Sequence, residues 1–132
     1  MALTWLRLAA AAFLALHGLV HALGFVAQWQ LAKLEGLAYR TTIFNGAIEV
    51  GDTGARIVGL AWLVLVPAWL VAAYGVARAR PWALLAVGAV SVLAAIVAAA
   101  GMPETRLGLM LDVAIFAVAG YIGLIMRRPR TA

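Results

Sequence analysis

Residues 4–27 read TWLRLAAAAFLALHGLVHALGFVA. An apolar run of this length is long enough for an α-helix to cross a bilayer, which takes about 20 residues. The run also exceeds the apolar core of roughly 7–15 residues that is typical of a secretory signal peptide. We therefore expect a retained transmembrane helix, and we interpret the rest of the chain as the structure that surrounds it.

The composition supports the same interpretation for the whole chain of 132 residues. The sequence is 67% hydrophobic and 11% charged, with a mean hydropathy of +1.05. A soluble domain of this size has too much surface for its volume to hide so much apolar area. The net charge is +5, but the basic residues stand at the ends of apolar runs, where they act as topology signals. We therefore predict the lipid bilayer as a partner and no nucleic acid.

Four apolar runs predict four transmembrane helices, at about residues 4–27, 53–77, 81–100 and 106–126. Helices are expected because backbone groups in hydrocarbon must be hydrogen-bonded within the segment itself. We predict an all-α integral membrane protein with a single domain over residues 1–132. Short connections favour an antiparallel up-down bundle of the four helices. Pro81 and Pro103 are expected to open the third and fourth helices.

The longest polar segment is the predicted outer loop, residues 28–52. Within it, Asn45-Gly46 stands between two β-prone runs, which is the strongest short signal for a β-hairpin with a primed turn. This turn pairs Ile43 with Ile48. An isolated hairpin is marginally stable in water, so we expect it to lie against the helix ends or the membrane surface. Asp52 or Thr53 is the expected N-cap of the second helix.

The distribution of basic residues predicts the orientation. With four spans, both termini and the turn at residues 78–81 share one side. The basic residues on that side are Arg7, Arg78, Arg80, Arg127, Arg128 and Arg130, with no acidic residue among them. The other side carries both signs, with the basic residues Lys33, Arg40, Arg56 and Arg106. We therefore predict cytoplasmic termini and an extracytoplasmic loop at residues 28–52.

His17 and His21 lie four residues apart, on one face of the first helix. Two interpretations remain open: hydrogen bonds that hold the bundle together, or a ligand, proton or metal site. The H-x-x-x-H spacing suits a metal, but Gly18 stands where a zinc protease has its glutamate. Both rings project from one face, so a haem with two histidine ligands would have to be shared between two chains.

Asp112 is the other ionisable residue inside a predicted span. It lies on a face of small residues that predicts packing against other helices, namely Gly108, Ala119 and Gly123. His21 and Asp112 stand at equal counts from the outer ends of their helices. We therefore expect them within hydrogen-bond or one-water distance. Arg56 is the rival partner for Asp112, in which case the pair is structural.

Three segments resemble a known group of proteins: LALHGLVHALGF at 14–25, LAYRTTIFNG at 37–46 and GDTGARIVGLAWL at 51–63. They are similar to small uncharacterised four-helix bacterial membrane proteins that are sometimes labelled generically as permeases. The resemblance covers roughly the first half of the chain and implies the fold and a bacterial inner-membrane location. Ile48-Glu49 stands where that group often carries a Trp-Asp pair. The chain holds no second repeat of the kind that transporters use, so the permease label gains no support.

The chain contains no phosphate loop, no nucleophile with a base partner and no cysteine, so we predict no catalytic residues. The favoured interpretation is a non-enzymatic accessory or assembly subunit of a membrane complex, with another membrane protein or a second copy as partner. The alternative is a ligand-, proton- or metal-binding membrane protein. Its candidate residues are His17, His21, Asp112 and Arg56, with His17 and His21 as metal candidates. No cofactor is predicted; a metal ion or a haem shared between chains is the alternative.

Overall fold

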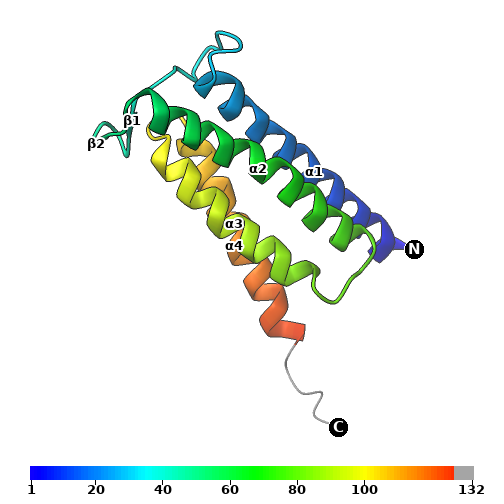
Figure 1. Cartoon of the computed structure of the whole chain (residues 1–132). Coiled ribbons are helices and arrows are strands. Elements are labelled where there is room, and N and C mark those ends of the chain that lie inside the picture. The colour runs from blue at the N-terminus through cyan, green and yellow to red at the C-terminus, as the bar shows by residue number, and fades with distance from the viewer. Residues whose placement is uncertain (127–132) are drawn as a thin grey trace.

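The computed structural model describes residues 1–126. It contains four helices and a two-stranded sheet (Figure 1): α1 (Ala2–Gln28), β1 (Thr42–Ile43), β2 (Ile48–Glu49), α2 (Gly51–Ala77), α3 (Ala83–Ala100) and α4 (Arg106–Met126). Each helix is long and apolar enough to span a membrane. Every helix end lies within two residues of its predicted boundary, so the four predicted helices are confirmed. Arg127, Arg128 and Arg130 lie outside the described residues.

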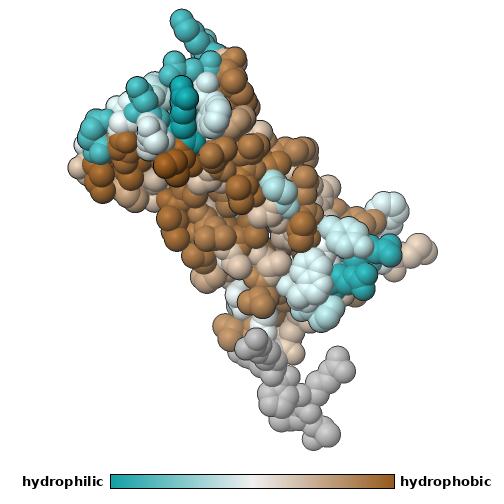
Figure 2. Space-filling view, viewed as in Figure 1, coloured by the Kyte–Doolittle hydropathy of each residue, from teal (hydrophilic) through white to brown (hydrophobic). Residues whose placement is uncertain are grey.

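The helices pack in chain order, with α1 along α2, α2 along α3 and α3 along α4 (Figure 1). The buried core lies where α2 meets its neighbours, around Trp69, Leu65, Ala72 and Ala94. Most large apolar side chains instead point outward. Apolar residues cover the middle of the face in Figure 2, and hydrophilic residues gather at its two ends. Among the described residues, polar side chains inside the bundle are few. The burial of each one in apolar surroundings calls for a physical explanation.

The interface between α1 and α2 is built from glycines that face tryptophans. A Cβ atom at Gly18 would overlap the Cβ of Trp69, and one at Gly24 would overlap the ring of Trp62. Only a residue without a side chain lets the two helices approach so closely at these points. This contact fixes how α1 is rotated on α2, and it brings the histidines of α1 beside the two tryptophans.

The predicted hairpin is present with the predicted register. Ile43 pairs with Ile48, and the φ angles of Asn45 and Gly46 are 57° and 84°, as a primed turn requires. The amide of Phe44 donates a hydrogen bond of 3.0 Å to the carbonyl of Ala100. The hairpin is therefore held against the end of α3, as expected for a two-stranded element that is marginal alone.

The predicted cap of the second helix is wrong. Helix α2 begins at Gly51, with Val50 at the N-cap position and no side-chain cap. Gly51 has a φ of +64°, so the chain turns from strand to helix two residues earlier than expected. The carboxylate of Glu49 accepts the Gly51 amide at 3.1 Å. Asp52 instead accepts a hydrogen bond from the hydroxyl of Tyr39, which ties the loop to the first turn of α2.

The proline predictions are also wrong in detail. Helix α3 begins at Ala83 and α4 at Arg106, so Pro81 and Pro103 lie in the turns that precede these helices. Trp82 occupies the N-cap position of α3 and packs against the face of Gly75, near the end of α2. This contact packs Trp82 against the end of α2, in the connection that leads to α3.

Candidate functional site

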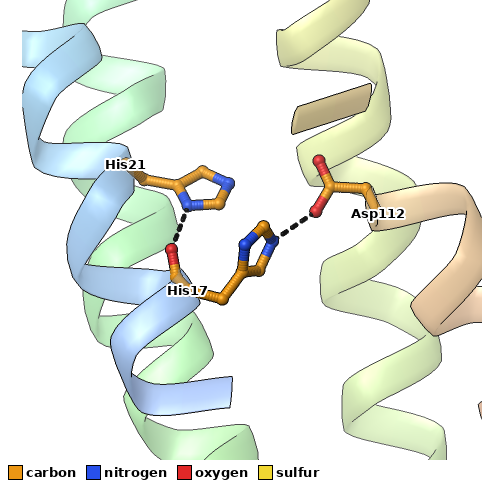
Figure 3. Close-up of side chains that lie close together, drawn as sticks. All are labelled: His17, His21 and Asp112. Atoms are coloured by element: carbon orange, nitrogen blue, oxygen red, sulfur yellow. Dashed lines mark hydrogen bonds and ion pairs between the residues drawn. The ribbon is translucent and has the colours of Figure 1, made fainter. Parts of the chain in front are cut away.

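Three buried ionisable side chains meet inside the bundle (Figure 3). His17 and His21 on α1 are 8% and 4% exposed, and Asp112 on α4 is 1% exposed. One ligand atom from each residue lies within 4.8 Å of those of the other two. The prediction that all three face the interior is confirmed.

His17, rather than His21, is the direct partner of Asp112. Nε2 of His17 donates a hydrogen bond of 2.7 Å to Oδ1 of Asp112. The prediction that His21 lies within hydrogen-bond or one-water distance of Asp112 is confirmed, because their ligand atoms are within 4.8 Å. The direct bond comes from His17, one helical turn earlier on α1.

His21 is held by the backbone of its own helix. Its Nδ1 lies 2.9 Å from the carbonyl oxygen of His17. A carbonyl accepts only, so Nδ1 carries the proton and donates it. In the neutral ring Nε2 then bears a free lone pair. The ring points across toward Asp112 in Figure 3, so His21 offers an acceptor or a metal ligand to the space between α1 and α4.

Two buried polar atoms at the pair of His17 and Asp112 lack a hydrogen-bond partner among the described residues. They are Oδ2 of Asp112 and Nε1 of Trp69. The Trp69 ring stands edge-on to His17, with centroids 4.9 Å apart. A buried polar atom without a partner costs about 1–3 kcal/mol, and in native proteins it calls for an explanation such as an ion, a ligand or water. The site therefore holds two free acceptors, Oδ2 of Asp112 and Nε2 of His21, and Nε1 of Trp69 is a buried donor beside them without a partner among the described residues.

Arg56 lies elsewhere, and the predicted alternative pair of Arg56 with Asp112 is wrong. The Arg56 guanidinium lies over the ring of Trp29, 5.8 Å from its centroid. The Trp29 indole N–H also donates to the carbonyl of Arg56 at 3.1 Å. Arg56 lies in the second turn of α2, near the hairpin end of the helix. Within residues 1–126, the ionic partner of Asp112 is His17.

A pocket of about 510 Å³ adjoins the three residues. Residues of α1 and α4 line it, together with Val58 and Trp62 of α2 and residues of the loops at the hairpin end of the bundle. Three apolar residues of the lining are more than half exposed, so they mark an opening on the surface between α1 and α4: Leu16, Val20 and Leu107.

The pocket has polar groups at two ends and apolar walls between them. His17, His21 and Asp112 lie at the deep end, toward the middle of the helices. Arg40 of the loop forms an ion pair with Glu104, which precedes α4, at the loop end. This pair ties the loop to the turn between α3 and α4. The arrangement suits a molecule with an apolar body and a small polar group.

The small-residue face of α4 is packed only in part. Ala119 is buried, but Gly108 lines the pocket. A Cβ at Gly108 or at Gly123 would meet nothing within 4 Å in the described chain. The expectation that this face packs along its length is therefore wrong at these two glycines, because Gly108 borders the pocket and no described residue lies against Gly123.

Sequence reasoning missed the tryptophans and the ion pair that complete the site. Trp62 and Trp69 are seven residues apart, which puts them on one helical face, and glycines on α1 offered them a matching surface. That pattern was a usable signal. Arg40 and Glu104 are far apart in the chain, and no local pattern pointed to their pairing.

Comparison with protein-family models, with curated proteins and with solved structures finds no match to this chain.

Proposed function

We propose that this protein binds a lipid-soluble small molecule in the pocket between α1 and α4, with the polar end of the molecule at His17 and Asp112. The pocket itself is the observation that supports this proposal. Its volume of about 510 Å³ falls within the roughly 300–1,000 Å³ that is typical of ligand sites. Such sites have mainly apolar walls and a few converging polar groups, as this pocket does.

The proposal places the chain in the cytoplasmic membrane of a bacterium, as an antiparallel up-down bundle with both termini in the cytoplasm. Four helices of spanning length and the apolar middle of the face in Figure 2 support the insertion. Arg7, Arg78 and Arg80 at one end of the bundle support the orientation. In this setting the opening between α1 and α4 faces hydrocarbon, so the ligand reaches the pocket from the lipid.

The unpartnered carboxylate oxygen defines the chemistry of the ligand's polar end. Oδ2 of Asp112, a residue of the pocket lining, has no hydrogen-bond partner among the described residues and can accept a hydrogen bond. A hydroxyl group on the ligand can donate this bond, and it keeps two lone pairs with which to accept others. The apolar walls disfavour a charged body. We therefore propose a neutral amphipathic molecule with a hydroxyl or a similar donor–acceptor group.

A pair of glycine substitutions on α4 tests the proposal. Gly108 lines the pocket, and a Cβ there meets nothing within 4 Å of the described chain. Gly108→Leu therefore adds a side chain to the pocket wall at a position where its Cβ has room. Gly120 has equally open surroundings but does not line the pocket, so Gly120→Leu is the matched control. Protein purified from its native membrane is analysed by native mass spectrometry, and the released molecule is identified.

The wild-type protein and Gly120→Leu should carry the bound molecule, and Gly108→Leu should lose it. The proposal fails if the wild-type protein carries no small molecule, or if Gly108→Leu retains it at the wild-type level.

A second function, an accessory subunit of a larger complex, is favoured by the surface of α4. Among the described residues of this helix, Asp112 and Ala119 are buried. Gly120 and Gly123 would accept a side chain without contact. Small residues let transmembrane helices of two proteins approach closely. Co-purification of a stoichiometric membrane protein that is lost in Gly123→Leu would support this function, and a monomer in native membrane extracts would exclude it.

A further inference from the structure

We propose that His17, His21 and Asp112 bind one divalent transition-metal ion at the deep end of the pocket. The pocket supplies the remaining coordination position. This inference deepens the function proposed above, because the metal would anchor the ligand's polar end. The role given to the metal rests on that proposed function, but the binding of the metal does not.

The set of donor atoms selects the class of metal. Two imidazoles and one carboxylate suit zinc and neighbouring transition metals, whereas magnesium and calcium prefer oxygen ligands alone. Three protein ligands with one open position are also typical of zinc sites that bind a further molecule. The open position faces the pocket, since all three residues line it.

The electrostatics of the cluster favour a cation. Asp112 is 1% exposed, and its Oδ2 has no partner within the described residues. A buried carboxylate that is only half satisfied is costly, and a bound cation satisfies its free oxygen. His21 is already arranged as a ligand, because Nδ1 donates to a backbone carbonyl. Histidines that bind metals almost always use such a bond to direct the other ring nitrogen toward the ion.

The geometry requires a small contraction. Metal bonds of about 2.0–2.2 Å place tetrahedral ligand atoms roughly 3.4 Å apart. The three ligand atoms now lie within 4.8 Å, so side-chain rotation must shorten the longest separation by about 1.4 Å to reach that value. His17 Nε2 and Asp112 Oδ1 are closer than required, at 2.7 Å. The ion would take the place of the Nε2 proton of His17. In a neutral ring this proton moves to Nδ1, so the imidazole binds as a neutral ligand.

The wild-type protein allows a direct test, because the chain has two histidines and no cysteine. Full-length protein is made with a histidine-free affinity tag and ¹⁵N-labelled histidine, stripped with a chelator and titrated with Zn²⁺. We expect one Zn²⁺ per chain, with ring ¹⁵N shifts of metal coordination in both histidines and Nδ1 of His21 still protonated. Unchanged ring signals at saturating Zn²⁺ would overturn the proposal.

Variants test the same site with Co²⁺, whose visible spectrum reports its ligands. Co²⁺ should also quench tryptophan fluorescence, because the rings of Trp69 and Trp62 lie 4.9 Å from His17 and 5.4 Å from His21, respectively. His21→Gln and Asp112→Asn should weaken binding by more than the roughly 10–100-fold that loss of an outer-shell partner costs. The control variants Asp52→Asn and Glu35→Gln, which change acidic residues outside the pocket lining, should bind as the wild-type protein does. Equal affinity in all variants would contradict the proposed ligands.

The two proposals fail separately. Gly108→Leu reports on the lipid-soluble molecule, and the Zn²⁺ titration reports on the metal. A bound small molecule without a Zn²⁺ site overturns the metal inference alone. A Zn²⁺ site in a protein that carries no small molecule overturns the proposed function and leaves the metal site standing.

Discussion

Asp112 is a carboxylate inside an apolar bundle. The free-energy cost of burying it depends on its partner His17. Loss of one partner from a buried ion pair costs about 3–5 kcal/mol, because the remaining charge is left uncompensated. His17→Leu should therefore lower the free energy of unfolding by an amount in this range. Adding Asp112→Leu should recover most of it, because two apolar side chains then replace the pair. Unfolding in detergent measures the coupling in a double-mutant cycle.

Arg56 provides the control for this cycle. It lies over Trp29 and is not paired with Asp112, so Arg56→Met and Asp112→Leu should be additive within about 0.5 kcal/mol. If Asp112 is coupled to Arg56 and not to His17, the pairing of His17 with Asp112 is wrong. Asp112 and Arg56 then form a structural ion pair instead.

Tyr39 lies outside the helices and predicts a pH effect. Its hydroxyl donates to the carboxylate of Asp52, and this hydrogen bond raises the pKa of Tyr39 above 10.0. Since the bond favours the neutral phenol, its contribution to stability is complete below pH 10 and is lost as the pH rises through the folded-state pKa. With Tyr74→Phe and Tyr121→Phe, Tyr39 is the remaining tyrosine. Its tyrosinate absorbance should have a midpoint above 10.0.

The same titration in Asp52→Ala is the control. Without the carboxylate, the midpoint should move toward 10.0. A midpoint that Asp52→Ala leaves unchanged would show that another group, and not this hydrogen bond, raises the pKa of Tyr39.

Helices α1 and α2 depend on their glycine–tryptophan contacts. A Cβ at Gly18 overlaps the Cβ of Trp69, an atom fixed to the backbone, so relief requires one helix to move. Overpacking of this kind costs about 1–3 kcal/mol, and we expect Gly18→Ala to lower the unfolding temperature in detergent accordingly. Gly120→Ala meets nothing within 4 Å in the described chain and should leave it unchanged. Equal effects of the two substitutions would contradict the contact.

The hairpin depends on the left-handed backbone of its turn. Gly46 has a φ of +84°, and a side chain in this region costs about 1–2 kcal/mol. Gly46→Val should therefore loosen the turn and, with it, the bond from the Phe44 amide to Ala100. Hydrogen exchange at Phe44 should accelerate in Gly46→Val but not in Ala47→Val. Unchanged exchange in both variants would mean that the turn does not hold this contact.

At the scale of the whole molecule, local signals were predictable and contacts between distant segments were not. The helix boundaries follow from apolar runs that end in proline, glycine or charged residues. The pairing of Ile43 with Ile48 follows from Asn45-Gly46 alone. The bond of His17 to Asp112 depends on how far each helix extends, which residue counts do not reveal. The pair of Arg40 and Glu104 depends on the fold of two connections.

The proposed orientation follows from the distribution of charge over the bundle. Arg7, Arg78 and Arg80 stand at one end without an acidic residue, whereas the hairpin end mixes both signs. Retention of basic residues in the cytoplasm places the turn between α2 and α3 inside and the hairpin outside. The chain has no cysteine, so a single introduced cysteine reports the side of the membrane without background.

We expect a membrane-impermeant maleimide to label Ala47→Cys in spheroplasts, because Ala47 is exposed in the hairpin turn. Ala79→Cys, which is exposed in the turn between α2 and α3, should react only after the membrane is permeabilised. The opposite pattern would reverse the orientation. Labelling of both positions from outside would contradict the up-down bundle, because α2 would no longer cross the membrane between them. Each accessible position therefore tests the direction of α2, on which the placement of the other three helices depends.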